Sequence, residues 1–238
     1  MRGQNMHLAL KISSLSIVSF GILLLSSYAV IAQQRVDLNI VLAIDCSYSV
    51  DHEEFDLQVH GTAKAFTDQQ IIEAITQGTH GKIAITVVQW AGEANQVVTV
   101  PWTVVASKVD AYKLAIAIKS QPRRISEGST SMTAMLKKAG AMLLSAPNQS
   151  QRMVVDIASD GENNGGGRVR NARDAIVANG ITINGLSILN EVSYLNFYFE
   201  QRVIGGKGAF VQIANTYADF SKAIRQKLLR EILGGGII

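Results

Sequence analysis

The chain has 238 residues, of which 47% are hydrophobic and 17% are charged, and its formal net charge is +3. This length suits one domain plus a targeting segment, and the apolar content is sufficient for a hydrophobic core, which excludes an intrinsically disordered chain. The first 32 residues hold Arg2, Lys11 and no acid, so without them 20 basic side chains oppose 19 acidic ones, a balance of +1. The charge therefore gives no support for a nucleic-acid partner. A small group of cations at Arg168, Arg170 and Arg173 is best explained as solvated surface.

The N-terminal segment has the pattern of a secretory signal peptide. Basic residues precede an apolar stretch from 12 to about 30, and Val30 and Ala32 occupy the positions before a cleavage site. We expect residues 1–32 to be a signal peptide cleaved after Ala32, which makes the protein exported, either periplasmic or secreted. The alternative is an uncleaved membrane anchor, because the apolar stretch is nearly long enough to span a bilayer.

Strand and helix patterns alternate along the rest of the chain. Strands are predicted at residues 36–44, 82–90, 96–102, 153–159, 182–189 and 209–213. A helical stretch is predicted at residues 51 to about 77, helices at 108–120, 132–145, 169–179 and 217–232, and a short helix with a loop at 192 to about 203. The second and third strands are too close together for a crossover helix, so we expect them to form a hairpin.

These elements predict an α/β fold with one domain, over residues 33–233, and a flexible tail at 234–238. The domain is expected to be a doubly wound, mostly parallel six-stranded sheet with one antiparallel edge strand and helices on both faces. In such a sheet, ligands bind outside the carboxyl ends of the strands. Side chains at those strand ends are therefore the first candidates for a functional site.

Oxygen-bearing side chains follow the first buried strand in a D-x-S-x-S pattern, at Asp45, Ser47 and Ser49. A second buried strand ends at Asp160, and the loop G-S-T-S before the helix from residue 132 contributes Thr130. Carboxylate and hydroxyl oxygens are ligands for a hard cation such as Mg²⁺, rather than for zinc or copper. We expect the three loops to converge on one divalent cation.

This arrangement resembles the metal-ion-dependent adhesion site of von Willebrand factor type A domains, the integrin I-domain family. The likeness covers about residues 36–232, and the five site residues of that family are matched by Asp45, Ser47, Ser49, Thr130 and Asp160. The resemblance implies that the hydroxyls contact the metal directly or through water, that the carboxylates often act through water, and that a partner's carboxylate completes the octahedron. It implies Mg²⁺ as the cation, with Mn²⁺ or Ca²⁺ as alternatives.

More narrowly, the chain resembles an exported bacterial branch of this superfamily with no established function. The stretches that carry this likeness are residues 87–90, 100–102, 160–164, 182–186 and 203–206. The predicted function is a non-enzymatic, metal-dependent binding module of the bacterial envelope or secreted fraction. Its partner is expected to be a protein that presents an Asp or Glu carboxylate, with membrane contact only if the N-terminal segment stays uncleaved.

Two other functions remain open. An exported metal-dependent hydrolase would normally add a histidine or free carboxylate as a base, and His52, the only histidine near the motif in sequence, is better explained as a helix-surface residue. A structural domain with a vestigial site is the third possibility. No G-x-S-x-G elbow, dinucleotide fingerprint or P-loop spacing is present.

Four further residues raise questions that the sequence leaves open. Cys46 is expected to be a small, semi-buried residue rather than a nucleophile, and Tyr48 either lies on the rim of the site or packs beneath it. Glu162 is expected to be exposed, with a role as an additional metal ligand as the alternative. Asp156 lies inside a predicted strand, where a charge is costly unless it is paired, and its partner is not identified.

Overall fold

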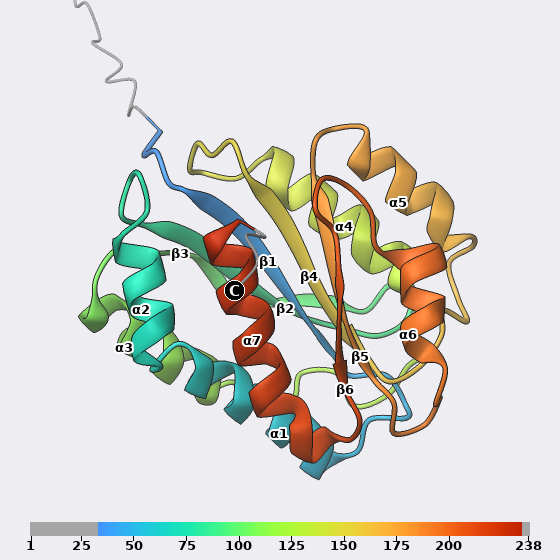
Figure 1. The fold of residues 1–238 in the computed structure, drawn as a ribbon. Helices are drawn as coiled ribbons and strands as arrows, with labels where there is room; N and C mark the ends of the chain where they lie inside the picture. Colours follow the sequence, from blue (N-terminus) through green and yellow to red (C-terminus); the bar gives the residue numbers. More distant parts are fainter. Residues whose placement is uncertain (1–32, 235–238) are drawn as a thin grey trace, which may run out of the picture. The chain divides into compact units, whose positions relative to one another are not determined.

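The structure is a computed structural model that describes residues 33–234, so the expected signal peptide and residues 235–238 of the predicted tail lie outside the described residues. Six strands form one sheet in the order β3-β2-β1-β4-β5-β6 (Figure 1). Their bounds are β1 Leu38–Asp45, β2 Ile83–Trp90, β3 Gln96–Val105, β4 Met153–Ser159, β5 Thr182–Ile188 and β6 Val211–Ala214. Neighbouring strands are parallel except for β2 and β3, which form the antiparallel hairpin at one edge. The predicted fold class is confirmed.

The helices cover both faces of the sheet. Their bounds are α1 His52–Ala65, α2 Gln69–Thr76, α3 Lys108–Lys119, α4 Met132–Leu144, α5 Val169–Val177, α6 Leu195–Tyr198 and α7 Phe220–Leu233. A π-helical turn, η1, spans Phe199–Val203, and a 3₁₀ turn, η2, spans Tyr217–Asp219. Within residues 33–234, no helix has the length and apolar character needed to cross a membrane.

The helical stretch predicted from residue 51 to about 77 consists of two helices, α1 and α2. Asp68 lies between them in an extended conformation and accepts hydrogen bonds from the backbone N–H groups of Gln70 and Ile71, which makes it the N-cap of α2. Two apolar residues of α3 face solvent, because 61% of the Val109 surface and 42% of the Tyr112 surface are exposed.

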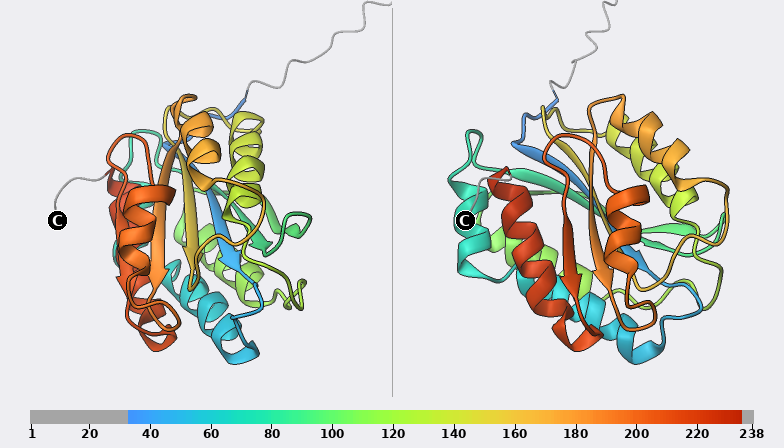
Figure 2. Two further views of the ribbon diagram at one scale, coloured as in Figure 1. Left: turned by 90° about the vertical axis from the view of Figure 1, so that its right-hand side faces the viewer. Right: turned by 45° about the vertical axis from the view of Figure 1, so that its right-hand side comes forward.

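The alternation of side chains along β1 divides the core into two layers. Leu38, Ile40, Leu42 and Ile44 pack into one buried cluster, together with residues of α1, α2, α3 and α7. Val41 and Ala43 point to the opposite face and pack with α4, α5 and the α6–η1 segment. The views in Figure 2 show these helices on the two sides of the sheet. Both faces of β1 are therefore buried, as its continuous apolar sequence predicts.

The strand order reverses at β1, which decides where a site can form. The chain passes from β1 to β2 on one side and later returns to place β4 on the other side of β1. The loops that leave the carboxyl ends of β1 and β4 therefore lie next to each other at the point where the strand order reverses, which is where ligands bind in open α/β sheets. Asp45 and Asp160 stand at this edge.

Candidate metal site

The loop after β1 and the loop after β4 meet through their polar side chains. The Ser49 Oγ donates a hydrogen bond to Asp160 Oδ1 at 2.8 Å, and the Ser47 Oγ lies 3.3 Å from the Ser49 Oγ. The Ser47 backbone N–H donates to Asp45 Oδ1 at 2.7 Å, which folds the D-x-S-x-S segment back on its own carboxylate. Four of the five predicted site residues therefore form one connected hydrogen-bonded group.

The third loop joins this group through Thr130. Its backbone N–H donates to Asn164 Oδ1 at 2.7 Å, and the backbone N–H of Asn164 donates to the Thr130 carbonyl at 2.9 Å. A Cβ placed on Gly161 would lie 3.8 Å from the Thr130 Oγ1, so the threonine hydroxyl faces the β4 loop. The Tyr48 N–H donates to the Gly128 carbonyl at 2.9 Å and ties the first loop to the third. The structure thus brings all five predicted residues to one place.

The two carboxylates of the site are buried side by side. Burial, and then the charge of Asp160, raises the pKa of Asp45 to about 7. Burial also raises the pKa of Asp160, against the hydrogen bond from Ser49 that lowers it. The Ser159 hydroxyl donates to Asp45 Oδ2 at 2.5 Å and keeps this carboxylate in place. The two ionised acids are costly here because they are buried and because they repel each other. A cation between them would reduce both the burial cost and the repulsion.

The donor set fits a divalent cation. Asp160 Oδ2 is buried and makes no hydrogen bond of normal geometry with the described residues, although the Tyr217 hydroxyl lies beside this carboxylate and lowers its pKa. Within residues 33–234, no three His, Cys, Asp or Glu side chains gather as a metal cluster. A cation here would therefore rely on hydroxyl and water oxygens beside the two carboxylates, which suits Mg²⁺ better than zinc.

A cavity of about 620 Å³ lies over these loops, and its lining includes Ser49 and Thr130. Tyr48 also lines it and is 83% exposed, so this ring stands on the rim of the site rather than packing under the loop. Glu162 does not line this cavity but a different one, beside α5. Cys46 is fully buried, and burial followed by the charge of Asp45 raises its thiol pKa to about 12, which agrees with a packing role.

Sequence reasoning missed Arg123, which organises the first loop from a distance. Its guanidinium donates to four backbone carbonyls of that loop, those of Cys46, Ser47, Val50 and Asp51. It also lies over the ring of Phe55, 5.8 Å from the centroid. No local pattern marks this arginine, since its role depends on a contact more than 70 residues away along the chain.

Two further residues near the carboxylates were not predicted. Ser159, which binds Asp45, could have been found from its position at the end of β4 immediately before Asp160. Tyr217 lies in η2 with its buried hydroxyl beside Asp160, and burial followed by that charge raises its pKa, so it stays protonated. Nothing in its local sequence points to the site.

Comparison with known proteins places the chain in a family. A family model described as "Protein of unknown function (DUF1194)" matches residues 35–235. The chain belongs to this family. No curated protein matches it. The DUF1194 family description assigns no activity, so function must be argued from the site.

Solved structures show which fold this DUF1194 domain has. Proximal thread matrix protein 1 from the mussel byssus, in a form with a zinc-occupied MIDAS motif, is 18% identical with a TM-score of 0.62, and the match covers 84% of this chain and 48% of that chain. A von Willebrand factor type A structure from Catenulispora acidiphila is 18% identical with a TM-score of 0.57, over 84% of this chain and 43% of that one. Manganese-loaded Plasmodium vivax TRAP protein is 15% identical with a TM-score of 0.55, over 83% and 73%.

These matches show the von Willebrand factor type A fold, as the sequence resemblance predicted. The DUF1194 chain corresponds to about half the length of the mussel protein. At these identities the likeness concerns the fold alone.

Proposed function

We propose that this protein is a metal-dependent binding module that holds a divalent cation at the carboxyl ends of β1 and β4 and binds a carboxylate of a protein partner there. The observation that carries the proposal is the buried pair Asp45 and Asp160, in which one Asp160 oxygen makes no hydrogen bond of normal geometry with any residue in 33–234. Two structures of the same fold support the proposal by analogy, because one has a zinc-occupied MIDAS motif and the other is loaded with manganese. The pattern of residues 1–32 supports an exported protein, in which such a module meets partners outside the cytoplasm.

The charged and the neutral residues of the site would have different roles in binding the cation. Asp45 and Asp160 bring two negative charges that offset a divalent cation, and Ser47, Ser49 and Thr130 add neutral oxygens. Mg²⁺ prefers six oxygens at about 2.0–2.1 Å and keeps several waters, so an exchangeable position on the cavity side would accept an incoming carboxylate. The hydrogen bonds of Arg123 and Ser159 hold the loop and the first carboxylate ready for this role.

Melting with and without metal tests the proposal. A ligand at 100 times its Kd stabilises the folded state by about 2.7 kcal/mol, which for a domain of this size raises Tm by about 5–10 °C. We expect this shift when Mg²⁺ or Mn²⁺ is added to wild type after chelation. Asp45→Ala should abolish the shift. The Tm measured in EDTA should change little, because the removal of one of two repelling buried charges offsets the loss of the hydrogen bonds from Ser47 and Ser159.

Asp56→Ala is the matched control, because Asp56 is an exposed acid on α1. This variant should keep the full metal-dependent shift. A wild-type protein whose Tm does not respond to Mg²⁺, Mn²⁺ or Ca²⁺ would show that the site is vestigial. A pull-down from envelope extract, with and without chelator, then tests partner binding, and a complex that survives EDTA unchanged would rule out the metal-bridged mode.

A further inference from the structure

A cavity of about 580 Å³ lies beside the proposed metal site, between the start of α5 and the α6–η1 segment. Three of its lining residues are cations: Arg168 and Arg170 at the start of α5, and Arg202 in η1. We call it the arginine pocket. Arg168 and Arg170 were predicted to form solvated surface together with Arg173, but Arg173 does not line the pocket and pairs with Asp174 at 2.7 Å. The third arginine of the pocket is Arg202, which comes from a later segment of the chain.

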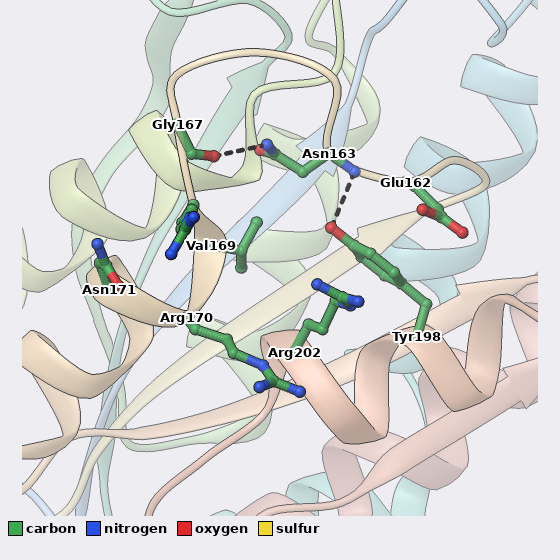
Figure 3. A pocket seen from close by; sticks show the side chains of 9 residues that line it. Glu162, Asn163, Gly167, Val169, Arg170, Asn171, Tyr198 and Arg202 are labelled. Carbon is green, nitrogen blue, oxygen red and sulfur yellow. Dashed lines mark hydrogen bonds between the residues drawn. The ribbon is translucent and has the colours of Figure 1, made fainter.

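The arginines of the pocket have no acidic partner in the part of the chain that the structure describes. None of the ion pairs and side-chain hydrogen bonds within residues 33–234 involves the guanidinium of Arg168, Arg170 or Arg202. Figure 3 shows Arg170 and Arg202 reaching from α5 and η1 into the space between these two segments. The acid in the lining is Glu162, which in this view lies on the other side of the Tyr198 ring from Arg202. The pocket therefore carries an excess of positive charge.

Other groups of the pocket also favour an anion. The Tyr198 hydroxyl accepts a hydrogen bond from the Asn163 N–H at 3.3 Å, so its own proton is available to a ligand, and burial raises its pKa, which keeps that proton in place. Arg202 lies over the Tyr198 ring, 5.9 Å from the centroid, which restrains the arginine. The N-cap of α5, Arg168, makes no side-chain capping bond, so the positive end of this helix adds to the field.

One loop separates the arginine pocket from the cavity over the metal site. Asn164 lines the metal-site cavity, whereas its neighbour Asn163 lines the arginine pocket. Both are fixed, because Asn164 Oδ1 accepts from the Thr130 N–H and Asn163 Oδ1 accepts from the Thr133 N–H at 3.1 Å. The two cavities are thus the two sides of the segment that begins with Asp160.

We propose that the arginine pocket is a second anion-binding subsite, which takes a carboxylate of an acidic peptide segment in the same partner that reaches the metal site. This inference rests on the proposed function, because it assigns the partner a chemical class. Guanidinium groups pair with carboxylates through two parallel hydrogen bonds. A stretch with several acidic side chains places one at the cation and another across the separating loop, and the pocket has the volume for a side chain rather than for a small ion alone.

Fluorescence anisotropy with a labelled deca-glutamate peptide tests this assignment on the full chain in Mg²⁺. Wild type should bind the peptide, and the double variant Arg170→Gln/Arg202→Gln should bind it at least about tenfold more weakly, since two charge-assisted contacts are lost. Both substituted side chains are exposed, so the fold should be unaffected. An unchanged affinity in the double variant overturns the proposal.

The matched control is Lys64→Gln/Lys119→Gln, which removes the same charge from exposed positions on α1 and α3. These helices pack on the other face of the sheet from α5. The control should keep its affinity within about twofold, as expected for remote surface charges. If both double variants lose affinity equally, the attraction is only the net charge of the protein, and the subsite does not exist.

The metal and pocket proposals fail in different measurements. The metal site is read from the Mg²⁺-dependent Tm without peptide, which the arginine substitutions should leave unchanged. If Mg²⁺ raises Tm but peptide binding ignores the arginines, the pocket proposal fails and the metal site stands. If Mg²⁺ does not change Tm but peptide binding still depends on the arginines, the metal-site proposal is rejected and the arginine pocket stands as an anion-binding site. If pyrophosphate binds in an arginine-dependent way and the peptide does not, the acidic-segment assignment is overturned.

Discussion

At the scale of single residues, a buried charge cluster answers the question that Asp156 raised. The Lys227 Nζ lies 2.6 Å from Asp156 Oδ1 and 2.7 Å from Glu231 Oε1, and the Asn184 Nδ2 donates to the same oxygen of Glu231 at 2.8 Å. One ammonium group faces two buried carboxylates, so their negative charge is only half offset. Burial, followed by the charge of Asp156, raises the pKa of Glu231 to about 8.

This shift predicts a pH dependence of stability in the absence of metal. The folded state holds the Glu231 proton more tightly than the unfolded chain, so its contribution is fully present below pH 4.5 and is lost as pH rises toward about 8. Glu231→Gln removes this titration while its amide oxygen can still accept from Lys227 and Asn184. Melting in EDTA at pH 5, 6.5 and 8 should show a smaller fall in Tm for the variant than for wild type.

The other charges that face Glu231 do not change this sign. The positive charge of Arg152, just before β4, interacts with Glu231, and Lys227 also pairs with Asp156 on β4. Glu73→Gln, at an exposed acid on α2, is the control and should follow the wild-type curve. An equally steep fall in Glu231→Gln and wild type would assign the pH dependence to another group.

At the scale of elements, the third loop depends on a glycine that touches the β2–β3 hairpin. Gly128 has φ 155°, and a Cβ on it would lie 3.0 Å from the Cβ of Ala91 and 3.2 Å from the backbone N of Gly92. Its carbonyl accepts the bond from Tyr48 that joins the first and third loops. A side chain here would push the loop away from the hairpin and from the metal site together.

We therefore expect Gly128→Ala to weaken Mg²⁺ binding as well as stability. Gly180 is the matched control, because its φ is 77° but a Cβ there would have no neighbour within 4 Å. Both substitutions should cost about 1 kcal/mol or more in unfolding free energy, since alanine is strained at positive φ. Titration of Mg²⁺ should show a raised Kd for Gly128→Ala alone. Equal Kd values would show that the loop is not positioned by this contact.

The sequence predicted the elements whose signals are local. The buried runs of β1 and β4, each ending at an acid, located the strands and the edge of the sheet where Asp45 and Asp160 meet. The break between α1 and α2 was missed although its signal is local, since Asp68 caps α2 through the N–H groups of Gln70 and Ile71. Arg123 and Tyr217 were missed for a different reason: their contacts with the site join segments far apart in sequence.

At the scale of the whole molecule, the site links three loops that the sheet fixes only where they join strands or helices. Loops after β1, before α4 and after β4 are joined by hydrogen bonds between Ser49 and Asp160 and between Thr130 and Asn164. Binding energy of a cation at this junction would act on the folded state as a whole. Partner binding and global stability should consequently respond together to chelation.

The rate at which a reagent modifies the buried thiol of Cys46 can measure this coupling between cation binding and stability. It is the sole cysteine of the chain, it is 0% exposed, and it sits directly after Asp45. A chromogenic disulfide reagent can modify it only when the segment around it opens, so the colour develops at the rate of that opening. Magnesium should slow the reaction in wild type and leave Asp45→Ala unaffected, whereas equal rates with and without the ion would separate the motion of this segment from the cation. The natural cysteine therefore reports, without any added label, how often the loop at the proposed metal site opens.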